Sequence, residues 1–155
     1  MSVIYTVTFN PAIDYVVYLD GSLKLGDINR NRSEAFQFGG KGINVSNVLK
    51  TLGHDTVALG FVAGFTGDGL ENGLRDMGLA TDFIHVKEGM TRINVKVKAA
   101  EETEINGIGP IITDEDMQAL IRQLDQILRE GDIVLVKASH SMEFEKISEA
   151  IKNQG

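Results

Sequence analysis

The stretch "FQFGGKGINVSN" at residues 36–47 holds the residues with the clearest chemical potential in this sequence. Its glycines and Lys41 precede a segment whose apolar residues recur at helical spacing. A helix start offers free backbone N–H groups and a partial positive charge, and the lysine adds a full charge. The pattern predicts either a site for an anion or a sugar hydroxyl, or a purely structural turn. It matches neither a Walker loop nor a G-x-G-x-x-G fingerprint.

Strand-like and helix-like segments alternate along the rest of the chain. Strands are predicted at residues 3–9, 55–64, 81–86 and 133–136, and helices at 42–53, 68–78, 113–131 and 141–155, the last two capped by Thr113 and Ser141. This alternation predicts an α/β fold with a mainly parallel sheet, whose ligands bind at the carboxyl ends of the strands. Amphipathic strands at 13–19 and 91–98 predict an added antiparallel flap.

Composition excludes several classes of function. A net charge of −7 and a pI near 4.9 argue against a broad nucleic-acid or anionic-membrane surface. The chain has no cysteine, and its three histidines show no metal-ligand spacing, so no disulfide or metal site is expected. No apolar run reaches the length of a membrane span and the first residues do not read as an export signal, so we expect a cytoplasmic protein.

Four separated motifs, in order, resemble the phosphofructokinase B group of the ribokinase-like sugar kinases. They are "TVTFNPAIDYVVYL", "FGGKGINVSNVLKTLGHDTVALGFVAG", "TRINVKVK" and "TEINGIGP". Within that family the pattern is most similar to 1-phosphofructokinases and then to tagatose-6-phosphate kinases. The resemblance implies a single ribokinase-like α/β domain over residues 1–155. It implies a three-layer sandwich with a small β lid, the lid strands lying within 13–19, 33–38 and 91–106. It also implies ATP-dependent phosphorylation of a ketose phosphate, with magnesium.

The resemblance also assigns substrate-binding residues. The family's sugar-binding aspartate falls on Asp14, and a carboxylate can accept two hydroxyl hydrogen bonds. The family's phosphate-binding glycine signature matches Gly39, Gly40, Lys41 and Asn44. The family's arginine that can bind a phosphate through its guanidinium matches Arg92. The lid segment places Glu104 and Asn106 near the substrate.

Structural alternatives stay open for these residues. Asp14 could be a solvated turn residue, Asn44 an ordinary first-turn helix residue, and Arg92 an exposed arginine at a strand end. Glu104 and Asn106 could simply pair lid strands. Asp68, in "FTGDG", is interpreted as a helix cap rather than as the family's catalytic aspartate.

The sequence departs from the family in two places. The catalytic aspartate, its anion hole and the ATP pocket belong to a second half that has no counterpart here, so the chain alone is expected to be inactive. The family's Gly-Ser-Leu-Pro turn is replaced by residues 137–142, and residues 133–153 are similar to the end of D-alanyl-D-alanine-adding muramoyl-peptide ligases.

Two hypotheses follow. The first is a kinase that converts fructose 1-phosphate to fructose 1,6-bisphosphate. The second is a catalytically incomplete fragment or chimera that binds sugar phosphate or only assembles with a partner. An incomplete sheet exposes an edge or an apolar face, so a homodimer or self-association is predicted in either case.

Overall fold

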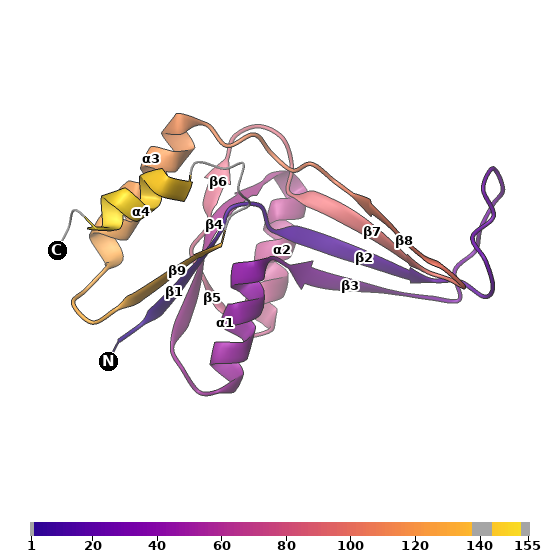
Figure 1. Cartoon of the computed structure of the whole chain (residues 1–155), viewed down its shortest axis with the longest axis horizontal. Coiled ribbons are helices and arrows are strands. Elements are labelled where there is room, and N and C mark those ends of the chain that lie inside the picture. Colours follow the sequence, from indigo (N-terminus) through magenta and orange to yellow (C-terminus); the bar gives the residue numbers. More distant parts are fainter. Residues whose placement is uncertain (1, 138–143, 153–155) are drawn as a thin grey trace.

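A parallel sheet forms the centre of the molecule. The computed structural model describes residues 2–137 and 144–152. The central sheet has the order β5 (Ala80–Thr81), β4 (Thr56–Ala63), β1 (Ile4–Thr8), β9 (Ile133–Lys137), and β6 (Ile84–Val86) also pairs with β4 (Figure 1). Every pairing in it is parallel, as the alternation of elements predicts. Among the described strands, β9 is paired on one side only.

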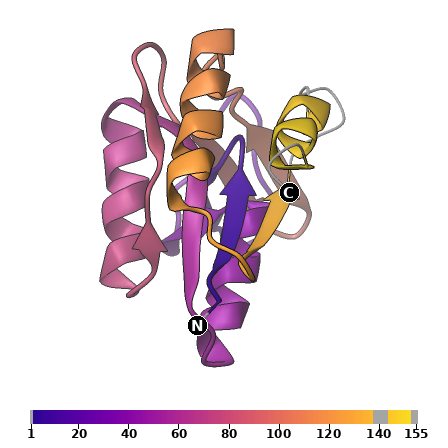
Figure 2. The same ribbon diagram turned by 90° about the vertical axis from the view of Figure 1, so that its left-hand side faces the viewer.

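Helices cover both faces of the central sheet and make three layers (Figure 2). On β4, Ala58 and Val62 pack with α1 (Lys41–Thr51) and α2 (Gly64–Asp76), whereas Leu59 and Phe61 pack with α3 (Asp114–Ile127) and α4 (Phe144–Lys152). Successive side chains of a strand point to opposite faces, so one apolar strand serves both layers. The ribokinase-like α/β sandwich predicted from the resemblance is confirmed.

A second, four-stranded sheet projects from one end of the molecule and is called the arm sheet here (Figure 1). Its order is β3 (Ser33–Gly39), β2 (Ala12–Tyr18), β7 (Arg92–Lys98), β8 (Glu102–Asn106). The prediction of an antiparallel flap is wrong for its middle pair, because β2 and β7 run parallel. Both strands leave the same end of the central sheet, β2 after β1 and β7 after β6, so they enter the arm in the same direction.

The interpretation of Asp68 as a helix cap is also wrong. α2 begins at Gly64, its N-cap is Ala63, and no side chain caps it, so Asp68 lies within the helix. The chain turns directly at Gly64, whose φ is +60°. Thr91 fixes this turn, because its hydroxyl accepts from the Ala63 N–H at 3.0 Å and its carbonyl accepts from the Thr66 hydroxyl at 2.8 Å.

The start of α3 follows its prediction. The Thr113 hydroxyl accepts from the Asp116 N–H, and the Asp116 carboxylate accepts from the Thr113 N–H, which is a capping box. The predicted cap of the last helix, Ser141, lies outside the described residues. Within the described part of the chain, no helix is both long and apolar enough to span a bilayer.

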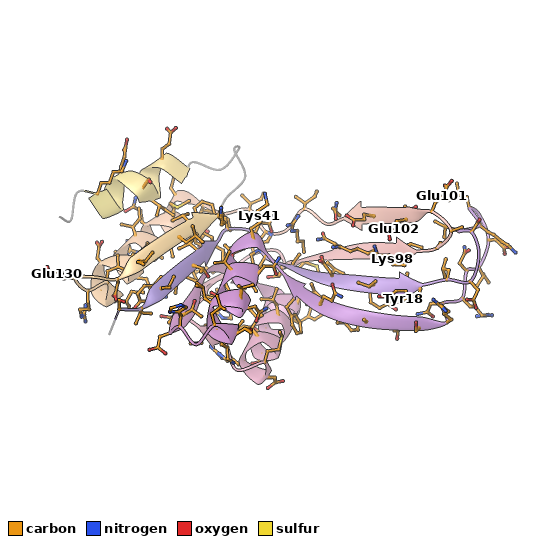
Figure 3. All side chains as sticks on the ribbon, turned by 60° about the horizontal axis from the view of Figure 1, so that its bottom comes forward. Tyr18, Lys41, Lys98, Glu101, Glu102 and Glu130 are labelled. Carbon is orange, nitrogen blue, oxygen red and sulfur yellow. The ribbon has the colours of Figure 1, made fainter. Side chains whose placement is uncertain are left out.

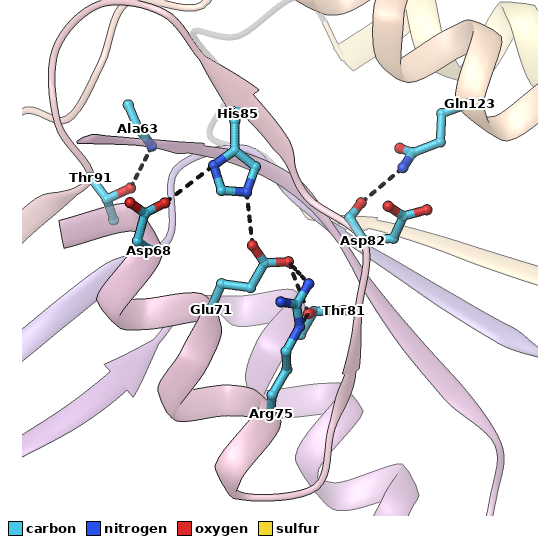
Figure 4. Close-up of polar contacts among 9 residues, drawn as sticks. All are labelled: Ala63, Asp68, Glu71, Arg75, Thr81, Asp82, His85, Thr91 and Gln123. Carbon is cyan, nitrogen blue, oxygen red and sulfur yellow. Dashed lines mark hydrogen bonds and ion pairs between the residues drawn. The ribbon is translucent and has the colours of Figure 1, made fainter. Parts of the chain in front are cut away.

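A buried carboxylate fixes α2 against the edge strands (Figure 4). Glu71 accepts from the Arg75 guanidinium at 2.7 Å and from the Thr81 hydroxyl at 3.0 Å, and its other oxygen lies 2.8 Å from His85 Nε2. His85 Nδ1 faces Asp68 at 3.5 Å. Because Glu71 is only 4% exposed, its carboxylate loses most of its hydrogen bonds with water on folding, and these contacts replace them.

Replacing Glu71 with alanine should therefore lower the free energy of unfolding by about 1–3 kcal/mol, because a buried network loses its shared acceptor. Urea unfolding followed by circular dichroism measures this. Glu130→Ala, at an exposed carboxylate, is the matched control and should change stability by less than about 0.5 kcal/mol. Equal effects of the two substitutions would contradict this role of Glu71.

Candidate functional site

The register of the arm sheet brings distant residues to one face. Gln37, Asp14, Asn94 and Asn106 stand in one row across the four strands, in that order. The row nearer the central sheet consists of Gly39, Ala12 and Arg92. The row farther from the central sheet consists of Ala35, Val16, Lys96 and Glu104. Residues two apart on a strand share a face, so all three rows line the same side of the arm. This side is called the polar face here.

The Asp14 carboxylate meets the glycine bend at the base of the arm. A Cβ atom on Gly39 would lie 3.2 Å from Asp14 Oδ2, so the absence of a side chain at residue 39 leaves room beside the carboxylate. The next residues, Gly40 and Lys41, are the N-cap and first residue of α1. Figure 3 shows Lys41 where the arm joins the central sheet, far from Tyr18 and Glu102 at the other end of the arm. The sequence-predicted aspartate and glycine bend therefore lie together.

The start of α1 packs tightly on the end of β1. Gly40 has a φ of +145°, and a Cβ there would lie 2.7 Å from Thr8 Cγ2. A Cβ on Gly42 would lie 2.5 Å from Thr8 Oγ1 and 3.2 Å from the Val7 carbonyl oxygen. No side chain caps this helix and its first turn has no acidic residue, so no side chain of the helix start offsets the partial positive charge of its first N–H groups. Asn44, on the first turn, is exposed.

Two side chains of β7 hold the Asp14 carboxylate. Asn94 Nδ2 donates to Asp14 Oδ1 at 2.8 Å, and the Lys96 ammonium lies 3.0 Å from Asp14 Oδ2. Lys96 also lies 4.0 Å from Glu104 on β8. The hydrogen bond to Asp14 raises the pKa of Lys96 above its usual value. Desolvation lowers this pKa to a smaller extent, and the charges of Asp14 and Glu104 raise it further.

Several buried polar atoms around this site have no hydrogen-bond partner among the described residues. They include Thr8 Oγ1 beside Gly42, Arg92 Nε on the polar face, and Asn10 Oδ1 in the turn after β1. Buried polar groups are normally paired, so a concentration of unsatisfied ones marks where a bound molecule can complete the hydrogen bonds.

Reasoning from the sequence missed Asn94 and Lys96 as partners of Asp14. Alternation in "RINVKVK" places both residues opposite the apolar side chains, on a face expected to be exposed. In the structure, however, Asn94 is only 7% exposed. The shared face with Arg92 is the signal that could have pointed to them, but their contact with Asp14 depends on a pairing between strands 80 residues apart.

The likeness to known proteins agrees with this geometry. The model of the pfkB family carbohydrate kinases matches residues 7–155. The chain belongs to the pfkB family of carbohydrate kinases. It is 49% identical to a 1-phosphofructokinase of Bacillus subtilis over 97% of its own length, and 44% identical to a D-tagatose-1-phosphate kinase of Bacillus licheniformis over 80%. A crystal structure of a candidate phosphofructokinase from Staphylococcus aureus superposes with a TM-score of 0.88 at 42% identity, over 98% of this chain.

The chain spans about half the length of these relatives. It covers 50% of the Bacillus subtilis enzyme, 40% of the Bacillus licheniformis enzyme and 50% of the Staphylococcus aureus chain. The likeness of residues 133–153 to muramoyl-peptide ligases stays a prediction, and residues 138–142 of the divergent turn lie outside the described residues.

Nowhere in residues 2–137 and 144–152 do three histidine, aspartate or glutamate side chains come together as metal ligands would. What the site offers is a set of donors and cations for an anion, together with the Asp14 carboxylate for hydroxyl groups.

The close contact at Gly42 gives a test of how the bend is built. Gly42→Ala should destabilise the protein by about 1–3 kcal/mol, because the added methyl group overlaps Thr8 and the β1 backbone. Gly69→Ala, at a helical glycine with nothing within 4 Å of the added Cβ, is the matched control. It should be neutral or stabilising by up to about 1 kcal/mol. Thermal unfolding of both variants decides, and a stable Gly42→Ala protein would contradict the packing at the bend.

Proposed function

We propose that this chain forms the sugar-phosphate-binding part of a 1-phosphofructokinase-type kinase, one that transfers a phosphoryl group from ATP to fructose 1-phosphate. In this proposal residues 1–155 are one domain and the arm sheet is its lid. ATP and sugar phosphates are charged molecules that do not cross membranes unaided, so the reaction belongs to the cytoplasm.

One observation carries the proposal, namely the meeting of Asp14 with the glycine bend. The Asp14 carboxylate can accept hydrogen bonds from sugar hydroxyls, while cationic groups and backbone donors a few residues away can hold a phosphate. A phosphorylated sugar offers both hydroxyls and a phosphate. The 49% identity to a 1-phosphofructokinase favours fructose 1-phosphate among such sugars.

The roles follow from the chemistry of each group. Asp14 accepts from hydroxyls of the ketose, and its pairing with Lys96 holds the carboxylate in place for this task. Lys41, the N–H groups at the start of α1 and the Arg92 guanidinium attract the phosphate. Arg92 Nε is suited to this, because it is a buried donor without an acceptor in the described chain. Gly39, Gly40 and Asn44 line the bend, and Glu104 and Asn106 approach from β8.

The nucleotide would supply the phosphoryl group, and a magnesium ion bound to it would neutralise its charge. The relatives are twice as long as this chain, so we assign the nucleotide to the half that has no counterpart here. The chain by itself then binds the acceptor sugar without turning it over, which is the fragment hypothesis in its simplest form.

Calorimetry with fructose 1-phosphate in the absence of ATP tests the sugar site. Asp14→Ala should weaken binding at least about tenfold, because hydrogen bonds to an ionised group are lost, and Lys41→Ala should weaken it about three- to tenfold. Lys152→Ala, at an exposed lysine of α4, removes the same charge elsewhere and should leave binding unchanged. No binding heat with the wild-type chain would refute the proposed site, and turnover in the presence of ATP and magnesium would refute its inactivity.

Self-association through the arm sheet is part of the same proposal. The face opposite Asp14 carries a row of four apolar or aromatic residues, which are Phe36, Tyr15, Val95 and Ile105. Phe36 and Ile105 are 63% and 65% exposed, and the rings of Phe36 and Tyr15 stack with centroids 4.9 Å apart. An apolar row of this kind on an extended sheet is suited to a second copy of the same surface.

Sedimentation velocity should then show a dimer that Ile105→Glu converts to a monomer, because burying an unpaired carboxylate in an apolar interface is costly. Ile111→Glu, at another isoleucine that is 83% exposed but lies outside the arm, is the matched control and should stay dimeric. A wild-type monomer at high concentration, or dissociation by both substitutions, would contradict pairing through this face.

A further inference from the structure

Asn94 connects three strands of the arm through one side chain. It lies on β7, donates from Nδ2 to Asp14 Oδ1 on β2 at 2.8 Å, and accepts at Oδ1 from the Gly107 N–H directly after β8 at 3.2 Å. At 7% exposure it has little contact with water. Both ends of its amide are therefore occupied by the protein.

The contact with Gly107 determines which way the amide points. A backbone N–H can only donate, so the atom that faces it must be the amide oxygen. The NH₂ group then faces Asp14, and it can donate there only to a carboxylate oxygen that carries a lone pair. Asn94 thus holds Asp14 Oδ1 and fixes the direction of the carboxylate.

Gly107 has a further structural role. Arg92 and Ile93 leave no space for a side chain at this residue, since a Cβ would lie 2.8 Å from the Ile93 carbonyl oxygen and 3.1 Å from Arg92 Cβ. The end of β8, which carries Asn106, is thereby held close to the strand that carries Arg92. A movement of β8 would stretch or break the hydrogen bond from Gly107 to Asn94, the residue that also holds Asp14.

We infer that Asn94 is a positioning residue for sugar recognition, which orients the Asp14 carboxylate and couples it to the position of β8. This inference rests on the proposed function of the site. Asn94 and Lys96 each occupy one oxygen of Asp14, and a second lone pair on each oxygen remains for a ligand. A sugar that offers two neighbouring hydroxyls can use both, so the chemical feature that this arrangement selects is a vicinal diol.

Asn94→Asp gives a test with a pH signature. The substitution keeps the shape and the acceptor for Gly107, but it places a second carboxylate against Asp14. A pair of carboxylates at this distance keeps one proton up to a higher pH than an isolated carboxylate does. This proton lies between the two groups and restores a donor toward Asp14. The charged groups on the same face are Arg92 and Lys96 on β7 and Glu104 on β8, and Lys41 begins α1 beside the bend, while the row neighbours Gln37 and Asn106 are uncharged.

The experiment measures the dissociation constant of fructose 1-phosphate for the 155-residue chain from about pH 5 to about pH 8. Each value is divided by that of the wild type at the same pH, which removes the titration of the ligand phosphate. For Asn94→Asp the ratio should be about 30 at the upper end and fall to about 3 at the lower end. Asn94→Leu should weaken binding about tenfold at every pH, because it loses the donor without adding a charge. Asn47→Asp, the same substitution on α1, should give a ratio near one throughout.

A second measurement uses the unaltered protein and does not depend on the folding of any variant. The side-chain amide signal of Asn94 and the backbone signal of Gly107 should shift in the NMR spectrum as fructose 1-phosphate is added, and both should saturate together with those of residues 39–44. If the wild type binds but Asn94→Asp shows a ratio that does not change with pH, or if the Asn94 signal stays still, the inference is overturned while the proposed function stands. Absence of wild-type binding would overturn both.

Discussion

The backbone of residues 40–42 lies closer to the end of β1 than any side chain would allow. Added Cβ atoms at Gly40 and Gly42 would meet Thr8 at 2.7 and 2.5 Å, so the start of α1 can rest on this strand only because both residues are glycine. This contact determines where the first turn of α1 begins and where its N–H groups point. The positions of Lys41 and Asn44 follow from it.

The second constraint is the common origin of the arm strands. β2 and β7 both leave the carboxyl edge of the central sheet and pair in parallel, and β3 and β8 add to their outer edges. Residues from four separate segments thereby reach one polar face beside the glycine bend. The other face of the arm carries the row of Phe36, Tyr15, Val95 and Ile105, and the alternation of a β-strand separates it from the polar face.

Sequence patterns predicted local structure well and relative position poorly. Periodicity identified the strands around Val7 and Leu59 and the helix after Gly40, and the capping pattern identified Thr113. The start of α2 was misplaced, because its turn is fixed by Thr91, far away in the sequence, rather than by a local cap.

The same distinction holds at the site. The resemblance to the kinase family pointed to Asp14 and the glycine bend, and the structure brings them together. It did not point to Asn94 or Lys96, because their contacts arise from the register between β2 and β7. Local sequence carries no information about that register, which depends on the whole intervening α/β unit.

The central claim is that the Asp14 strand and the 39–44 bend bind one phosphorylated ketose together. The most direct measurement is an NMR titration of the 155-residue chain with fructose 1-phosphate, followed residue by residue. We expect amides on β2 near Asp14 and amides of residues 39–44 to shift with a single common dissociation constant. Shifts confined to another surface, such as the cavity of about 660 Å³ between the loop after β6 and α3, would contradict it.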